Sequence, residues 1–279
     1  MKILLTGHKG QLGQVLLPRL ANHQVVGVDL PERDITDREE LLALARQFRP
    51  DLLIHPAAMT NVDGCARDPQ AAYRVNGMGT QNVALAAVEV GAEMLYVSTN
   101  EVFDGHAEEP YHEWATRQPI NAYGRSKLAG EWYTQSLLDR FYIVRTAWLY
   151  AAGGNNFPHK MIQLADKHGS LKVVTDEIGN PTYVEDLAQA IAQLIQTHAY
   201  GIYHFVNRGA VSRFEFAQEI LRLSGRADIP IEPLSSVHFA RASTPPLYAP
   251  LANNAGAAVG ITLRPWQEAL AEALARDGE

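Results

Sequence analysis

The chain has 279 residues, of which 24 are Lys or Arg and 31 are Asp or Glu, so its formal net charge is −7. This length allows one large α/β core or one domain with a smaller lobe, because compact domains rarely exceed roughly 250 to 300 residues. The acidic balance argues against a nucleic-acid or anionic-membrane surface, since no cluster of Lys and Arg is long enough to neutralise a row of phosphates.

Short apolar segments and helical segments alternate through the first half of the chain. The predicted strands are 2–6, 24–29, 51–55, 94–98 and 141–145. The predicted helices are 11–21, 37–48, 69–90 and 122–138. The strands are apolar on both faces, and their βαβ spacing predicts a parallel sheet of at least five strands with helical crossovers.

After Tyr150 the predicted elements become shorter. Helices are expected at 157–168, 184–196, 213–224 and near 265–275, with extended segments at 172–174 and 202–206. Residues 235–258, rich in Pro, Ala, Ser and Asn, are expected to be mostly loop. We interpret residues 1–150 as a dinucleotide-binding Rossmann domain that receives returning segments from the C-terminal part, and 151–279 as mainly a substrate-binding lobe or lid. The predicted fold class is therefore α/β, a Rossmann-type doubly wound parallel sheet with a smaller C-terminal lobe.

Gly7, Gly10 and Gly13 fall between the first strand and the first helix. A side chain at these positions would obstruct the tight turn, the approach of a pyrophosphate, or the packing of helix on strand. A glycine-rich turn without a ligand is the plainer reading, and the flanking strand and helix favour the dinucleotide.

Asp29 ends the second strand, where a carboxylate can accept both ribose hydroxyls of NAD and repel the 2′-phosphate of NADP. The alternative is a solvated carboxylate at the end of a strand. His8, Lys9 and Arg33 favour NADP instead, because each could reach a 2′-phosphate if the loop folds back. The sequence therefore indicates NADH or NADPH without choosing between them.

Tyr123 and Lys127 lie four residues apart, and so share one face of the predicted helix 122–138. The ammonium can lower the pKa of the phenol from about 10 towards neutrality, and such a tyrosine can exchange a proton with a sugar or alcohol oxygen. Thr99, at the end of the strand 94–98, would supply a hydroxyl hydrogen bond to the same oxygen. Together they outline a hydride-transfer site, although Tyr and Lys at this spacing alone would equally suit an amphipathic anchor beside a solvated lysine.

These features together resemble those of an extended short-chain dehydrogenase/reductase. Along almost its whole length the chain is similar, more closely, to the dTDP-4-dehydrorhamnose reductase family. The matching stretches are 10–13 (GQLG), 56–63 (PAAMTNVD), 98–99 (ST), 102–105 (VFDG), 121–124 (NAYG), 126–131 (SKLAGE), 145–148 (RTAW), 154–157 (GNNF) and 179–182 (GNPT).

The resemblance implies a role for each matching residue. The implied cofactor-binding residues are Gly7, Gly10, Gln11 and Leu12 at the pyrophosphate, Asp29 at the adenosine ribose, Asp34 and Ile35 beside the adenine, Ala58, Met59 and Thr60 along the cofactor, and Tyr123 and Lys127. The implied catalytic residues are Thr99, Tyr123 and Lys127, and the substrate-binding residues are Thr99, Asn100, Glu101, Trp148 and Asn156. For Asn156, turn formation is the competing interpretation.

The implied reaction is delivery of hydride from the nicotinamide to the C4 ketone of a nucleotide-linked 4-keto-6-deoxysugar, with Tyr123 protonating the new alkoxide. This would serve the synthesis of dTDP-rhamnose, cell-surface polysaccharide or glycosylated natural products. The cofactor carries the hydride, and the protein supplies orientation and a proton.

The chain departs from the family pattern at two places. The family usually has Asp-Tyr after Ser-Thr, where this chain has Asn100-Glu101. A Thr-Asp-Glu triplet at this place is typical of nucleotide-sugar 4,6-dehydratases, in which the Asp is the acid and the Glu is the base for elimination of water. Glu101 suits the role of that base. Asn100 cannot donate the proton that the Asp would donate. The family also usually has Arg immediately before a proline that corresponds to Pro246, and Pro245 replaces it. Its loss weakens the case for a diphosphate clamp and leaves the sugar donor open.

Two other functions stay open at this point. One is another nucleotide-sugar epimerase, dehydratase or reductase of the same superfamily. The other is a non-catalytic cofactor-binding subunit, like the regulatory subunit of methionine adenosyltransferase, against which the intact Thr99, Tyr123 and Lys127 argue.

The single cysteine, Cys65, permits no internal disulfide and has no cysteine partners at metal-site spacing, so we expect no metal. The N-terminus leads directly into a strand without a signal-peptide core, and no apolar stretch approaches the roughly 20 residues that span a bilayer. We expect a cytoplasmic protein with a nucleotide-sugar substrate, without nucleic-acid or membrane partners, and with a homodimer left open.

Overall fold

The computed structural model describes residues 1–276, and its centre is a six-stranded parallel sheet. The strands are β1 (Lys2–Thr6), β2 (Gln24–Val28), β3 (Leu52–His55), β4 (Glu93–Thr99), β5 (Phe141–Thr146) and β10 (Gly201–His204). Their order is β10-β5-β4-β3-β1-β2, so the winding reverses between β1 and β3. In doubly wound sheets, ligands bind outside the carboxyl ends of the strands at such a reversal.

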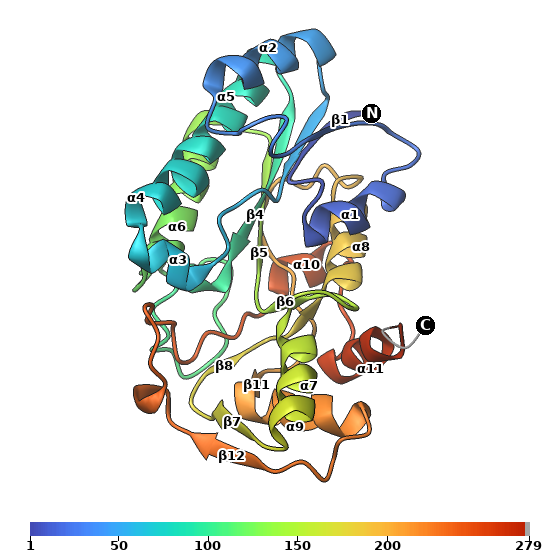
Figure 1. The fold of residues 1–279 in the computed structure, drawn as a ribbon. Helices are drawn as coiled ribbons and strands as arrows, with labels where there is room; N and C mark the ends of the chain where they lie inside the picture. Colours follow the sequence, from blue (N-terminus) through green and yellow to red (C-terminus); the bar gives the residue numbers. More distant parts are fainter. Residues whose placement is uncertain (277–279) are drawn as a thin grey trace.

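Helices cover both faces of this sheet (Figure 1). They are α1 (Gln11–Arg19), α2 (Arg38–Phe48), α3 (Val62–Arg67), α4 (Pro69–Ala72), α5 (Thr80–Val90), α6 (Ala122–Leu137) and α8 (Val184–Leu194). Figure 1 shows α2, α5 and α6 on one side of the sheet and α1 and α8 on the other. Alternate residues of β1 explain the two layers, because Ile3 and Leu5 join the core under α1 and α8, whereas Leu4 joins the core under α2 and α5.

The C-terminal half forms a smaller lobe at the carboxyl edge of the sheet (Figure 1). Its elements are β6 (Leu149–Tyr150), α7 (Phe157–His168), β7 (Leu171–Val174), β8 (Ile178–Gly179), β9 (Thr182–Tyr183), β11 (Val211–Ser212), α9 (Arg213–Leu223), β12 (Ile231–Leu234), α10 (Asn254–Ala258) and α11 (Trp266–Arg276). Three two-stranded sheets, β12-β7, β11-β8 and β6-β9, join these segments. The strand β10 leaves the lobe and pairs in parallel with β5, so the second half completes the sheet of the first.

The predicted helix over residues 69–90 is wrong in one respect, because its middle is a π-helical segment, Tyr73–Gly79. This wide turn contains Gly77 and Gly79, which have low helix propensity. It carries the buried Asn76, whose Oδ1 accepts a hydrogen bond from the Met59 backbone N–H at 2.7 Å. The Asn76 Nδ2 donates to the Ser126 hydroxyl at 2.9 Å. The distortion thereby ties the loop after β3 to α6, as π-bulges often do at functional sites.

Residues 235–258 are mostly loop, as predicted, and contain two short helical elements. Within the expected loop 235–258 the chain forms a 3₁₀ turn, Ser236–His238, and the short helix α10. None of the helices within residues 1–276 is long and apolar enough to cross a membrane.

Candidate active site

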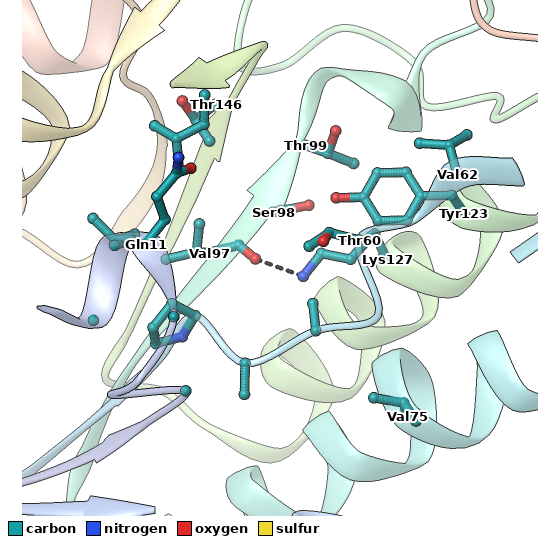
Figure 2. Close-up of a pocket in the computed structure, with 18 of the residues that line it drawn as sticks. Gln11, Thr60, Val62, Val75, Val97, Ser98, Thr99, Tyr123, Lys127 and Thr146 are labelled. Carbon is teal, nitrogen blue, oxygen red and sulfur yellow. Dashed lines mark hydrogen bonds between the residues drawn. The ribbon is translucent and has the colours of Figure 1, made fainter. Parts of the chain in front are cut away.

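A cavity of about 800 Å³ opens at the carboxyl edge of the sheet, where the winding reverses. Its walls come from the loops after β1, β2 and β3, the ends of β4 and β5, and the first turns of α6 and α9. Figure 2 shows Gln11 on one side of this pocket and Thr99, Tyr123 and Lys127 on the other.

The loop from β1 to α1 leaves room for an extended anionic group. Gly7 has φ +60°, a conformation that favours glycine, and a Cβ at Gly13 would lie only 2.2 Å from the Gly7 carbonyl oxygen. Gly10 is the N-cap of α1, and no side chain caps this helix. The first N–H groups of α1 therefore remain available to phosphate oxygens, and the cradle fits the pyrophosphate of a dinucleotide.

Asp29, directly after β2, lines the same pocket. Its Oδ2 accepts a hydrogen bond from the Lys9 backbone N–H, and its Oδ1 accepts one from the Leu30 backbone N–H, both at 2.9 Å. The carboxylate is thus fixed beside the glycine loop with acceptor capacity left for ribose hydroxyls.

Of the three residues that favoured a 2′-phosphate, Lys9 and Arg33 are paired with acids. The Lys9 ammonium pairs with Glu32, and Arg33 Nε lies 3.4 Å from Glu40. The ring of His8 packs on Gly27, where a Cβ would meet it at 2.5 Å. Lys9 and Arg33 still border the pocket, whereas His8 does not line it.

Replacing Asp29 with Ala should therefore weaken NADH binding more than NADPH binding. NADH loses charge-assisted hydrogen bonds from its ribose hydroxyls to Asp29, worth about tenfold or more in affinity. For NADPH the substitution also removes the repulsion between Asp29 and the 2′-phosphate, which offsets part of the loss. Fluorescence titration of both cofactors measures the difference. Asp29→Asn is the matched control, because it removes the charge and retains an acceptor. Equal losses for the two cofactors in Asp29→Ala would remove Asp29 as the discriminating group.

Tyr123 and Lys127 stand on the first turns of α6, next to the end of β4. Asn121 caps this helix by accepting the Gly124 N–H at 2.8 Å, and a Cβ on Gly124 would lie 2.0 Å from the Glu101 carbonyl oxygen. This close approach brings the helix start against the segment after β4. Figure 2 shows the Tyr123 hydroxyl pointing toward Thr99. The predicted proximity of Thr99, Tyr123 and Lys127 is present in the structure.

Lys127 is buried and well ordered by its contacts. Its Nζ donates to the Val97 carbonyl oxygen at 2.7 Å (Figure 2) and lies 4.3 Å from the centre of the Tyr96 ring. Burial lowers the pKa of Lys127 to about 7, against the effect of the Glu131 carboxylate.

The expectation that the ammonium lowers the pKa of Tyr123 is wrong for the protein without ligand. Burial raises the pKa of Tyr123 above its ordinary value, and the Glu101 carboxylate raises it further, whereas a hydrogen bond with Thr99 acts in the opposite direction. Desolvation is therefore the largest effect on this phenol. Tyr123 stays protonated at neutral pH, which suits a proton donor.

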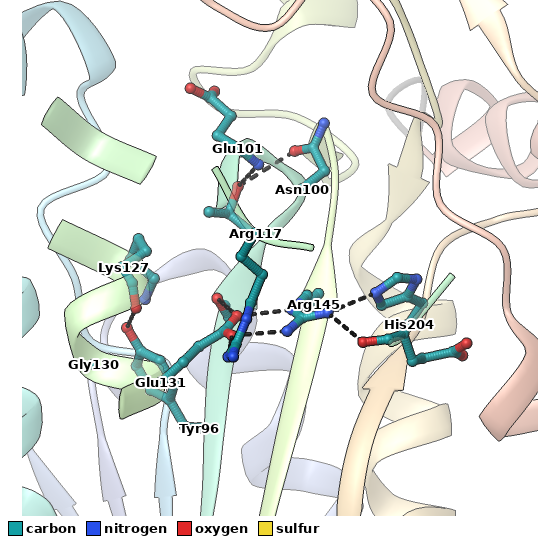
Figure 3. A network of polar contacts seen from close by, with 12 residues as sticks. Tyr96, Asn100, Glu101, Arg117, Lys127, Gly130, Glu131, Arg145 and His204 are labelled. Atoms are coloured by element: carbon teal, nitrogen blue, oxygen red, sulfur yellow. Dashed lines mark hydrogen bonds and ion pairs between the residues drawn. The ribbon is translucent and has the colours of Figure 1, made fainter. Parts of the chain in front are cut away.

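Behind Thr99 and Lys127 lies a buried ionic network (Figure 3). The Glu131 carboxylate accepts two hydrogen bonds from Arg145, each at 2.8 Å, and one from the Ser98 hydroxyl at 2.6 Å. Arg117 adds a fourth at 3.1 Å, and Arg145 also contacts His204 Nε2 at 3.2 Å. Since Glu131 stands one turn after Lys127 and Ser98 precedes Thr99, this network fixes both elements that carry the catalytic side chains.

Asn100 and Glu101 follow Thr99 and line the pocket. The Asn100 amide donates to the Ala249 carbonyl at 3.1 Å, and its Oδ1 accepts from the Thr99 hydroxyl at 3.3 Å. Glu101 Oε2 accepts from Asn121 at 2.6 Å. Burial raises the pKa of Glu101, and the Asn121 hydrogen bond opposes this.

Trp148 and Asn156 complete the predicted substrate side. Trp148 adopts φ +46°, an uncommon conformation for a residue with a side chain, and its ring lies on Gly179, where a Cβ would meet it at 2.7 Å. Asn156 lines the pocket and also caps α7, since its Oδ1 accepts from the His159 N–H at 3.2 Å. Both interpretations of Asn156 are compatible with this geometry.

Among the predicted site residues, only Met59 lies outside the pocket lining. Its backbone is held by Asn76, and its side chain packs against a small buried cluster that includes Cys65. Among the pocket residues that the predicted site did not include is a cation from the second half of the chain, Arg213. It begins α9 in the second half of the chain, and no local motif could have indicated that the fold brings it to the edge of β4.

Comparison with known proteins agrees with this geometry. The family model described as RmlD substrate binding domain matches residues 1–278. The chain belongs to this family. A dTDP-4-dehydrorhamnose reductase of Mycobacterium tuberculosis is 38% identical over 98% of this chain and 92% of the relative.

Two solved structures of dTDP-4-dehydrorhamnose reductases are similar to almost the whole chain. A dTDP-4-dehydrorhamnose reductase of Clostridium acetobutylicum has TM-score 0.94 and 40% identity, with 98% of each chain covered. One from Bacillus anthracis, in complex with NADP, has TM-score 0.91 and 38% identity, with 97% of each chain covered. The predicted family, its Rossmann-type fold and its class, the NAD(P)-dependent oxidoreductases, are confirmed.

Proposed function

We propose that this chain uses NADH or NADPH to reduce the C4 ketone of a dTDP-linked 4-keto-6-deoxysugar. The observation that carries the proposal is the shared pocket, which joins the glycine cradle and Asp29 to the hydroxyls of Thr99 and Tyr123. We assign the reaction to the cytoplasmic synthesis of dTDP-rhamnose or a related precursor of polysaccharide. We propose no metal, nucleic-acid or membrane partner.

The chain's own residues orient the ketone and hold a proton beside it. Bound nicotinamide supplies the hydride. Thr99 and Tyr123 both line the pocket, and we propose that their hydroxyls hydrogen-bond the C4 oxygen. Tyr123, kept protonated by burial, then gives its proton to the alkoxide oxygen, and the nearby Lys127 stabilises the phenolate that remains.

Elimination of water is the chief competing reaction, because Glu101 occupies the position of a dehydratase base. Asn100 speaks against it. Its amide has no acidic proton, and both ends of the amide are engaged, with Ala249 and Thr99. We therefore propose that Glu101 accepts a hydrogen bond from a sugar or nucleotide hydroxyl.

A panel of nucleotide 4-ketosugars tests the proposed function. Oxidation of NADH and NADPH is followed at 340 nm, a general property of reduced nicotinamides, for dTDP- and UDP-linked ketosugars. The proposal expects the fastest turnover with a dTDP-linked 4-keto-6-deoxysugar. Absence of cofactor oxidation with every ketosugar, or dehydration of dTDP-glucose instead, would contradict it.

Glu101→Gln should raise KM for the ketosugar by about tenfold and lower kcat less, because the substituted amide is a weaker acceptor for a hydroxyl. In the unmodified chain, KM should also rise as the pH falls through the raised pKa of Glu101, since protonation removes the ionised acceptor. Steady-state kinetics against pH measure both effects. Dehydration of dTDP-glucose that Glu101→Gln abolishes would instead identify Glu101 as an elimination base.

A further inference from the structure

Arg213 is a partly buried cation that lines the pocket beside Glu101. It is the first residue of α9, its side chain is 20% exposed, and it lines the cavity together with Glu101 and Trp148. Its guanidinium lies 3.5 Å from the centre of a Trp148 ring and 4.9 Å from that of Phe157. The two aromatic rings therefore fix the orientation of the guanidinium.

The donors of this guanidinium are unused. An arginine carries five N–H donors, and the hydrogen bonds among residues 1–276 include none from the side chain of Arg213. The nearest carboxylate oxygen, Glu177 Oε2, is 3.9 Å from its Nε. Glu177 is held instead by Arg241, whose Nη2 donates to its other oxygen. Burial lowers the pKa of Arg213 to about 10, with Glu177 and Glu101 acting in the opposite direction.

The place of Arg213 matches the chemistry of a sugar nucleotide. In such a molecule the diphosphate is attached to C1, and C4 lies across the pyranose ring. With C4 at the hydroxyls of Thr99 and Tyr123, the diphosphate must lie one sugar ring away. Trp148 lines this stretch of the pocket, and Arg213 stacks on its ring.

We propose that Arg213 binds the diphosphate of the nucleotide sugar. Its planar guanidinium can donate two parallel hydrogen bonds to phosphate oxygens. It thereby supplies a cation for the diphosphate in place of the Arg that the family usually has at the position of Pro245. This inference rests on the proposed function, which it deepens by naming the residue that recognises the anionic part of the substrate.

The surrounding charges are compatible with a bound anion. Glu101 and Glu177 are the carboxylates that face Arg213, and Arg241 is the second cation. These two carboxylates and two guanidinium groups carry no net charge together when all four are ionised. The diphosphate therefore meets no surplus negative charge, and Glu177 stays paired with Arg241 when Arg213 donates hydrogen bonds to the ligand.

The test measures binding rather than turnover. Calorimetric titration of the full chain with thymidine and dTDP, and with uridine and UDP, gives the affinity ratio of diphosphate to nucleoside for each base. Arg213→Gln should lower the ratio by about 10- to 100-fold while nucleoside affinity and NADPH affinity change little. Arg213→Met keeps an apolar stem against Trp148 and should give the same loss, so it replaces the Gln variant if that chain fails to fold.

Arg222→Gln is the matched control, since Arg222 is on the same helix, is 61% exposed and pairs with Glu219. It removes the same charge and should leave the ratio unchanged. A folded Arg213 variant with an unchanged ratio, or with equal losses for nucleoside and diphosphate, overturns the proposal. If the unmodified chain reduces the ketosugar and the Arg213 variant has an unchanged affinity ratio, the role of Arg213 is contradicted and the proposed function is not. If the Arg213 variant has a lowered affinity ratio but the unmodified chain reduces no ketosugar, the proposed function is contradicted and the role of Arg213 is not.

Discussion

Tyr123→Phe is expected to lower turnover of the ketosugar by about two orders of magnitude or more. The substitution removes the hydroxyl that faces Thr99 and leaves the ring in its place. Cofactor affinity should stay nearly unchanged, because the glycine cradle, Asp29 and the Lys127 contact with Val97 do not depend on the phenol oxygen.

Stopped-flow or steady-state kinetics, with a parallel titration of NADPH, measure both parts of this expectation. Tyr133→Phe is the matched control on the same helix, since the Tyr133 hydroxyl hydrogen-bonds the Tyr73 hydroxyl at an exposed position, at 2.8 Å. It should leave turnover unchanged. Near-normal turnover in Tyr123→Phe would remove Tyr123 from the mechanism.

Glu131→Gln is expected to destabilise the fold by about 3 to 5 kcal/mol. The substitution has nearly the same shape, but it leaves the fully buried Arg145 without its counter-charge (Figure 3). A loss of this size is a large part of the free energy of unfolding of an ordinary domain. Burial raises the pKa of Glu131, but its hydrogen bonds and the charge of Arg145 lower the pKa below the ordinary value, so the carboxylate is ionised at neutral pH.

Thermal and urea unfolding of the variant measure this loss. Arg117→Gln provides the comparison, because Arg117 contacts the same carboxylate from a position that is 26% exposed and should cost about 1 kcal/mol or less. Adding Arg145→Met to Glu131→Gln should recover part of the loss, since no buried charge then remains unpaired. A Glu131→Gln chain as stable as the unmodified chain would show that Arg145 is solvated or otherwise compensated.

Local sequence patterns predicted the dinucleotide half well. Apolar strands that end in Gly7, Asp29 and Thr99 can be read from a few residues each, because in a parallel sheet the carboxyl ends of the strands meet at one edge. Helical spacing places the tyrosine and lysine of α6 on one face, and the glycine turn and Thr99 elsewhere in the sequence indicate their role. For that reason all but one of the predicted site residues line a single pocket.

What the sequence pattern missed depends on long-range packing. Arg213 reaches the pocket through the pairing of β11 with β8 and through Trp148, which lies 65 positions earlier in the chain. The π-helical turn at Asn76 was missed because helix propensity does not distinguish it from a continuous helix. The pKa of Tyr123 was misjudged because spacing shows the neighbouring lysine but not the burial that raises the pKa of the phenol.

The most direct test of hydride delivery to C4 uses a deuterium label. The chain is incubated with a dTDP-linked 4-keto-6-deoxysugar and reduced cofactor deuterated at the nicotinamide C4, and the product is examined by NMR and mass spectrometry. We expect one deuterium per product molecule, located at C4 of the sugar. A product without deuterium, or with deuterium at another carbon, would contradict reduction of the C4 ketone at the site formed by Thr99, Tyr123 and Lys127.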